Sequence, residues 1–180
     1  MIKSFFCILV VAAVATAGDF IWFTFGVRDR MAFGVIHGAV LLMAVGGVLG
    51  FKAGRIVPGL LVGAASGVGG ALAYYALGSV GRATAMGIAW ASVWLFLALF
   101  DGLALRKGPG RVAEIVPRGL AAAISSGLTF YVVMGILWGH EQGVSRNYLY
   151  QFLAWIVAWG PGILALTTPF SKGRPHAQAD

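Results

Sequence analysis

The sequence predicts an all-α, polytopic membrane protein whose six transmembrane helices form three hairpins with an approximate internal repeat. Hydrophobic residues make up 59% of the 180 residues and charged residues 11%, whereas soluble domains carry about 25% charge. A chain of this length accommodates six spans of about 20 residues with short loops and no separate soluble domain. Two similar segments also carry small residues four positions apart, a spacing typical of helices that pack closely in lipid.

The first predicted span runs from about Ser4 to Val27 and contains Asp19. Lys3, the apolar stretch after it and the small residues at 15–17 also resemble a signal peptide with its cleavage site. Apolar residues continue through positions 20–23, which completes a full span. We therefore expect a retained helix, with a cleaved signal peptide as the alternative.

The next three spans are predicted at about Met31 to Gly50, Ile56 to Leu77 and about Ala83 to Leu105. The second contains His37, and the fourth contains Asp101 close to its end. Basic residues follow the second and fourth spans, as expected where a helix leaves the membrane on the cytoplasmic side.

The last two spans are predicted at Val116 to Trp138 and about Tyr148 to Thr168. Pro161 lies between two glycines in the sixth span and removes a backbone hydrogen bond, so this helix is expected to kink. Residues 1–170 thus form one transmembrane domain. The polar tail, residues 171–180, is expected to be disordered in the cytoplasm.

A ladder of small residues begins the third span, where Gly59, Gly63 and Gly67 are four residues apart and therefore lie on one face of a helix. The segment is preceded by Ile-Val-Pro, and the fifth span repeats this opening before Gly119 and Gly127. We expect the ladder to be a seam inside the bundle. Such ladders also permit a homo-oligomer, and the sequence alone does not decide which helix they face.

The even-numbered spans share a second pattern. Trp90 and Trp94 are four residues apart, as are Trp155 and Trp159, and His37 occupies the corresponding place in the second span. These matches favour three repeated hairpins, formed by spans 1–2, 3–4 and 5–6. The alternative is that glycine- and alanine-rich helices resemble one another through composition alone.

The basic residues predict that both termini are cytoplasmic. With the N-terminus inside, nine lysine and arginine residues fall on the inner side and four on the outer side, in agreement with the positive-inside rule. The inner residues are Lys3, Lys52, Arg55, Arg106, Lys107, Arg111, Arg118, Lys172 and Arg174, and the outer ones are Arg28, Arg30, Arg82 and Arg146. We expect an integral protein of a bacterial inner membrane.

Ionisable residues within a span are costly and therefore mark candidate sites. Asp19 either contacts a cation, a proton or a polar ligand inside the bundle, or lies near the outer interface and reaches Arg28 or Arg30. His37 is expected to form a hydrogen bond within the bundle, with Asp19 as its partner, which would make a proton-sensitive pair. Asp101 is either a solvated helix end with a local ion pair, or a polar anchor that holds the cytoplasmic ends of the helices, or a residue that docks a partner.

Trp90, Trp94, Trp155 and Trp159 lie deep in their spans. They are expected either to line a cavity for a flat apolar ligand or to pack against the small-residue ladders. Pro161 supports the first interpretation, because broken helices border binding cavities in transporters.

No arrangement of catalytic residues is found in the sequence. It has no Ser/His/Asp set, no histidines or carboxylates spaced to hold a metal, and no phosphate-binding glycine motif. The single cysteine, Cys7, excludes a disulfide framework. The net charge of +7 is explained by basic residues facing an anionic membrane surface. We expect no enzyme, no metal, no cofactor and no nucleic-acid partner.

Three segments of the C-terminal half resemble the Insig family of six-span membrane proteins. They are Leu99-Phe100-Asp101, followed by basic and glycine residues, then Tyr131-Val132-Val133-Met134-Gly135, and Tyr148-Leu149-Tyr150 before a glycine-rich stretch. The resemblance covers about the last ninety residues. The chain departs from the family in two respects. Basic residues follow Asp101 only after five positions, and the family's prolines early in the second span are absent.

The Insig resemblance implies a non-enzymatic, regulatory protein with a lipid-binding cavity. Animal members bind an oxysterol, whereas for this chain we expect a glycerolipid-like ligand. Two alternatives remain. A small transport protein, similar to the six-span substrate-binding subunits of vitamin transporters, would use Asp19 and His37 for substrate or proton contact, and Ala13 and Ala17 for docking. A scaffold or assembly subunit would need no ligand.

Overall fold

The computed structural model describes residues 2–26, 28–105, 112–133 and 147–168. These residues are almost entirely helical and include no β-strand. The six long helices are α1 (Ile2–Phe25), α2 (Arg30–Lys52), α3 (Ile56–Ala76), α4 (Arg82–Phe100), α5 (Val112–Val133) and α6 (Tyr148–Thr167). A short 3₁₀ helix, η1 (Gly78–Val80), precedes α4, and a π-helical turn, η2 (Asp101–Leu105), continues it.

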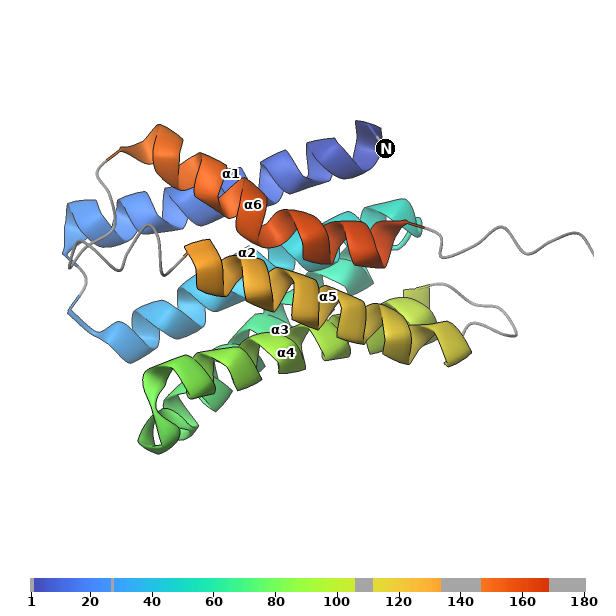
Figure 1. The fold of residues 1–180 in the computed structure, drawn as a ribbon. Coiled ribbons are helices and arrows are strands. Elements are labelled where there is room, and N and C mark those ends of the chain that lie inside the picture. Colours follow the sequence, from blue (N-terminus) through green and yellow to red (C-terminus); the bar gives the residue numbers. More distant parts are fainter. Residues whose placement is uncertain (1, 27, 106–111, 134–146, 169–180) are drawn as a thin grey trace, which may run out of the picture.

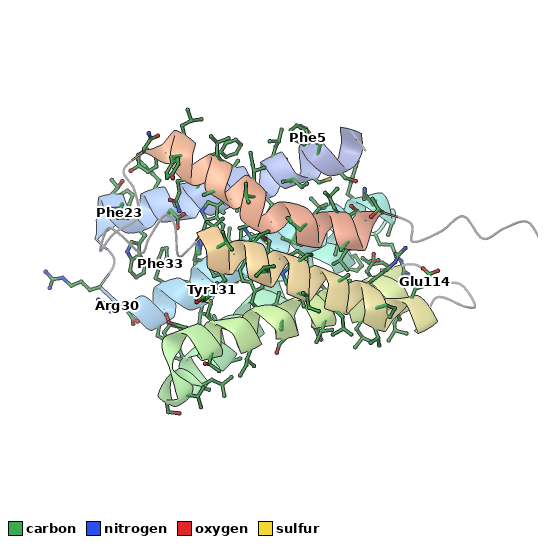
Figure 2. All side chains as sticks on the ribbon, viewed as in Figure 1. Phe5, Phe23, Arg30, Phe33, Glu114 and Tyr131 are labelled. Atoms are coloured by element: carbon green, nitrogen blue, oxygen red, sulfur yellow. The ribbon has the colours of Figure 1, made fainter. Side chains whose placement is uncertain are left out.

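All six helices are long and apolar enough to cross a membrane, as the sequence predicts. Figure 2 shows the charged side chains of Arg30 and Glu114 at opposite ends of the bundle. Large apolar side chains are exposed midway along the helices, among them Ile124 and Leu128 of α5 and Val157 of α6. This distribution places apolar surface on the sides of the bundle and charge at its ends.

The helices form a closed ring. Each of them packs against the next in the sequence, and α6 packs back against α1. Figure 1 shows α1 and α6 side by side, although they are the first and last helices. The interior of the ring is therefore surrounded by all six helices.

The glycine ladder of α3 forms the closest seam, and α2 lies on the other side of it. A Cβ atom added at Gly63 would clash with the backbone carbonyl of Leu42, and one at Gly67 would clash with the carbonyl of Gly38. Gly59 faces the backbone of α2 at Gly46 in the same way. The ladder therefore packs within the chain's own bundle.

The ladder of α5 faces α4 instead. A Cβ added at Gly119 would lie 3.0 Å from the Cβ of Ala98, and one at Gly127 would lie 3.7 Å from Cδ1 of Trp90. Both ladders thus face the helix that precedes them in the chain.

The fifth helix begins earlier than the sequence predicts, at Val112 rather than Val116, so that Pro117 lies inside it. Glu114 falls in the first turn, where a negative charge stabilises the helix N-terminus. The predicted end of this span, Trp138, and the predicted tail 171–180 lie outside the described residues.

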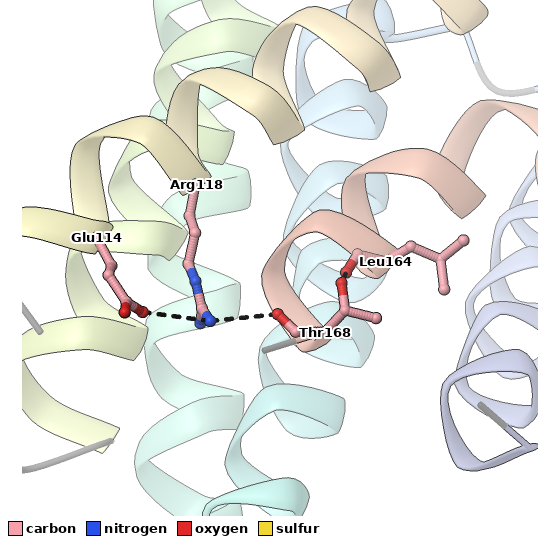
Figure 3. Close-up of polar contacts among 4 residues, drawn as sticks. All are labelled: Glu114, Arg118, Leu164 and Thr168. Atoms are coloured by element: carbon pink, nitrogen blue, oxygen red, sulfur yellow. Dashed lines mark hydrogen bonds and ion pairs between the residues drawn. The ribbon is translucent and has the colours of Figure 1, made fainter. Parts of the chain in front are cut away.

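Polar contacts join the helices at the end of the bundle that holds Ser4. The Oγ of Ser4 accepts hydrogen bonds from Lys52 Nζ at 2.9 Å and from Thr167 Oγ1 at 3.2 Å. Arg118 forms an ion pair with Glu114 at 3.4 Å and donates to the Thr168 carbonyl at 3.2 Å (Figure 3). These contacts link α1 to α2 and α6, and α5 to α6.

Candidate functional site

A cavity of about 280 Å³ opens within the ring and is lined by residues from all six helices. It lies in the half of the bundle that holds the α1–α2 and α3–α4 connections. Asp19 comes from α1, His37 from α2, Tyr74 and Tyr75 from α3, and Phe130 from α5, while tryptophans of α4 and α6 form the remaining wall. All six candidate ligand-binding residues from the sequence line this one cavity. They are Asp19, His37, Trp90, Trp94, Trp155 and Trp159.

Asp19 faces the interior of the bundle and contacts α6. Its Oδ2 accepts a hydrogen bond from Gln151 Nε2 at 2.8 Å and one from Trp155 Nε1 at 2.6 Å. Gln151 is itself buried. The expected alternative contact with Arg28 or Arg30 is not formed. Both arginines are exposed, and Figure 2 shows Arg30 extending away from the helices.

His37 lines the cavity close to Asp19, but no hydrogen bond joins the two among the described residues. The imidazole stacks on Phe33 of the same helix, with ring centroids 5.3 Å apart and planes inclined by 12°. It also lies directly against Gly18, where an added Cβ would overlap the ring. The expected hydrogen bond is therefore replaced by packing, because the ring contacts the α1 backbone one residue before the carboxylate.

The four tryptophans form one aromatic wall. The ring centroid of Trp159 lies 4.7 Å from that of Trp90, 5.6 Å from that of Trp94 and 6.3 Å from that of Trp155. Phe130 of α5 stacks on Trp90 with centroids 4.4 Å apart. The i, i+4 spacing on α4 and α6 directs both pairs to the inside of the ring.

Ser126 fixes this wall from behind. The Trp90 Nε1 donates to Ser126 Oγ at 3.2 Å, and the Ser126 hydroxyl donates to the Ala158 carbonyl of α6 at 2.8 Å. Pro161 lacks the N–H that would normally bond to the carbonyl of Val157, four residues earlier. Ala158 is the next residue after Val157. In Figure 1 the second half of α6 runs in a different direction from its first half. The serine hydroxyl thus links α4, α5 and α6 close to Pro161.

Two indole N–H groups of the wall have no hydrogen-bond partner among the described residues. They belong to Trp94 and Trp159, whose side chains are both 0% exposed. The Oε1 of Gln151 is likewise buried without a partner. A buried polar group left unsatisfied costs about 1–3 kcal/mol. All three atoms are enclosed by the packed side chains of the bundle rather than exposed to the cavity.

Two glycines make room for the wall and for the cavity rim. A Cβ added at Gly162 would lie 2.5 Å from Cη2 of Trp94, so the indole occupies the space that a side chain would take. A Cβ added at Gly34 would lie 2.6 Å from the Tyr75 hydroxyl, which donates to the Arg30 carbonyl.

Asp101 lies outside this cavity. It is 3% exposed, at the start of η2, so it is buried within the bundle rather than solvated at a helix end. Together with Glu114 and Arg118 it borders a small second cavity of about 20 Å³. Gly59 and Gly63 belong to the α2–α3 seam, whereas Gly67 reaches the edge of the large cavity. Ala13 and Ala17 of α1 are exposed and do not line it.

Sequence reasoning missed Gln151, Ser126 and Phe130. A signal for Gln151 exists, because it precedes Trp155 and Trp159 by four and eight residues and so shares their helix face. The described residues contain no group of three or more histidine, cysteine, aspartate or glutamate side chains placed to hold a metal ion.

No protein-family model matches the chain, and no similar curated protein or solved structure was found. The resemblance to the Insig family therefore stays a prediction.

Proposed function

We propose that this chain is a non-enzymatic integral membrane protein that binds a lipid or another apolar small molecule in the cavity between its six helices. The observation that carries this proposal is the cavity of about 280 Å³, which residues from all six helices line. Its lining combines the Asp19 carboxylate and the His37 imidazole with aromatic side chains from four helices. Concave, mostly apolar pockets with a few polar groups are the usual form of small-molecule sites.

Exposed apolar side chains support membrane insertion. Ile124 and Leu149 are 67% and 68% exposed on helices long enough to span a bilayer. In water such a surface would favour aggregation, whereas lipid tails cover it without cost. We propose that the bundle crosses the membrane six times with both termini in the cytoplasm, because the basic residues are concentrated at that end.

The three-hairpin repeat is part of the proposal. His37, Trp90 and Trp155 occupy equivalent places on α2, α4 and α6, and all three line the cavity. Both glycine ladders face the preceding helix. These shared features support a repeated unit over similarity of composition.

The size of the cavity limits the ligand. Pockets for drug-sized molecules span about 300–1,000 Å³, and this cavity measures about 280 Å³. It therefore suits a small molecule or one part of a lipid, such as its headgroup or a segment of one acyl chain.

Native mass spectrometry of the purified protein tests the proposal. We expect a bound molecule of defined mass, retained at one copy per chain. Ala71 of α3 lines the cavity, and Ala71→Phe should fill part of it and lower the retained fraction. Ala76→Phe, at the exposed end of the same helix, is the matched control and should retain the molecule. Equal loss from both variants, or no retained molecule in the parent protein, would contradict the proposal.

Transport is the second candidate, favoured by Pro161 in the helix that carries Trp155 and Trp159. Interrupted helices border the binding cavities of transporters, where they change shape as the site opens. A water-soluble molecule retained in place of a lipid, or a co-purifying ATPase, would favour this alternative.

A further inference from the structure

The charge balance of the cavity is one-sided. Asp19 is the acidic residue in its lining, and no lysine or arginine of the described chain lines it. His37, Tyr74 and Tyr75 are the other titratable groups in the described lining. Both hydrogen bonds to Asp19 come from neutral groups, the amide of Gln151 and the indole of Trp155.

One oxygen of the Asp19 carboxylate is available to a ligand. The two hydrogen bonds from α6 both end on Oδ2, and no hydrogen bond to Oδ1 is formed among the described residues. Asp19 is half-buried, and a carboxylate partly withdrawn from water is stabilised by a cation or by several hydrogen-bond donors. Since the protein supplies two neutral donors, a positive charge on the ligand would complete the compensation.

Aromatic rings line the cavity that holds the carboxylate. The Nε1 of Trp155 lies 2.6 Å from Oδ2 of Asp19, so the edge of the indole ring lies beside the carboxylate. The cavity is also lined by Tyr74, Tyr75, Phe130 and three further tryptophans. Organic cations are attracted to aromatic faces within about 6 Å of the ring centroid, and aromatic walls are the usual means of binding alkylated ammonium groups.

We propose that the ligand of this cavity carries an ammonium group, which pairs with Asp19 and lies against the aromatic wall while an apolar body fills the remaining space. This inference rests on the proposed function and narrows its ligand class. The ammonium belongs either to a small amphipathic amine or to the headgroup of a lipid. Both sources share the chemistry that the cavity recognises.

Binding of a cation and of its uncharged isostere to the lipid-free protein tests the proposal. Benzyltrimethylammonium and neopentylbenzene have the same shape and differ in charge. We expect the cation to quench tryptophan fluorescence at saturable concentrations, and the neutral compound to bind about tenfold or more weakly. Stronger or equal binding of neopentylbenzene overturns the cation assignment while leaving the apolar cavity in place. Binding of neither compound, together with the absence of a retained molecule, contradicts the proposed function itself.

Two matched substitutions test whether the Asp19 carboxylate is the negative charge that binds the cation. Asp19→Asn keeps the shape of the side chain and removes its charge, so affinity for the cation should fall about tenfold or more with little change for the neutral compound. Asp29→Asn is the control, because Asp29 is exposed at the same end of the bundle and caps α2 through the Ala32 N–H. Asparagine caps a helix equally well, so this variant should bind as the parent does. If Asp19→Asn folds and binds the cation unchanged, the proposal is wrong. Asp19→Glu retains the charge and should retain binding if Asp19→Asn fails to fold.

Competition by lipids in nanodiscs identifies the source of the ammonium group. Displacement of the probe by phosphatidylethanolamine but not by phosphatidylglycerol assigns it to a lipid headgroup. Displacement by neither assigns it to a free amine. Equal displacement by both lipids overturns the proposal, since phosphatidylglycerol carries no ammonium.

Discussion

The indole Nε1 of Trp155 donates a hydrogen bond of 2.6 Å to Oδ2 of Asp19, which lies 136 residues earlier in the chain. This contact joins the last helix of the ring to the first. It also fixes Asp19, the one acidic group among the described residues of the cavity lining, beside the aromatic wall. One contact thus contributes both to closure of the ring and to the shape of the candidate site.

Removing the N–H of Trp155 should loosen this closure. Trp155→Phe keeps an aromatic ring and leaves Asp19 with the bond from Gln151 alone, so we expect a loss of about 1.5–3 kcal/mol, the value of a hydrogen bond to a charged group. Thermal unfolding in detergent measures it. Trp22→Phe is the control, because Trp22 packs edge-on against Phe33 near the same end of the bundle. Equal melting temperatures for the two variants would show that the bond has no role in stability.

The α2–α3 seam should tolerate no side chain at Gly63. Gly63→Ala places a Cβ against the backbone carbonyl of Leu42, so we expect destabilisation of about 1–3 kcal/mol, as for other overpacked sites. Gly69→Ala on the same helix meets nothing within 4 Å and should be neutral or stabilising by up to about 1 kcal/mol, because alanine favours helix. Resistance to unfolding by dodecyl sulfate compares the two, and a stable Gly63→Ala variant would contradict the observed seam.

Ser126 should contribute more to the stability of the fold than Ser125, the serine beside it. Ser126→Ala leaves the Trp90 N–H and the Ala158 carbonyl without their shared partner, which should cost about 1–3 kcal/mol and shift the tryptophan emission. Ser125 donates to the Ala121 carbonyl within its own helix, so Ser125→Ala should leave both nearly unchanged. Chemical denaturation monitored by tryptophan fluorescence compares the two variants. A larger destabilisation by Ser125→Ala than by Ser126→Ala would show that Ser126 does not support the aromatic wall.

Labelling of single cysteines should reveal the proposed topology. In a Cys7→Ala background, Ser79→Cys places a thiol on the α3–α4 connection and Thr168→Cys places one after α6, both at exposed positions. A membrane-impermeant maleimide should label the first in intact cells and the second only after lysis. The reversed pattern would invert the orientation, and labelling of both in intact cells would exclude the proposed crossing.

The helices and the inward-facing residues were predictable because they depend on local patterns. The i, i+4 tryptophans of α4 and α6 and the glycine ladder of α3 each define one helix face from residues close in the sequence. That face must then be buried or filled, and the structure places the tryptophans in a cavity wall and the glycines in a seam.

The neighbours of each helix were less predictable. Nothing near Asp19 in the sequence indicates that Gln151 and Trp155 would be its partners, because apolar helices of similar length can form many rings. The burial of Asp101 was equally hard to predict, because its position near basic residues resembles a solvated helix end. The π-helical turn at Asp101–Leu105 instead continues the helix past this residue. Such outcomes depend on packing between distant segments.

The contact between α1 and α6 also has a consequence for biogenesis. A ribosome makes the first helix long before the last, at about 5–20 residues per second. The Asp19 carboxylate is therefore synthesised on the order of 10 s before Gln151 and Trp155 at that rate. In the proposed membrane topology, the carboxylate lacks both of its α6 partners during this interval. The closure of the ring therefore waits for synthesis of the final helix.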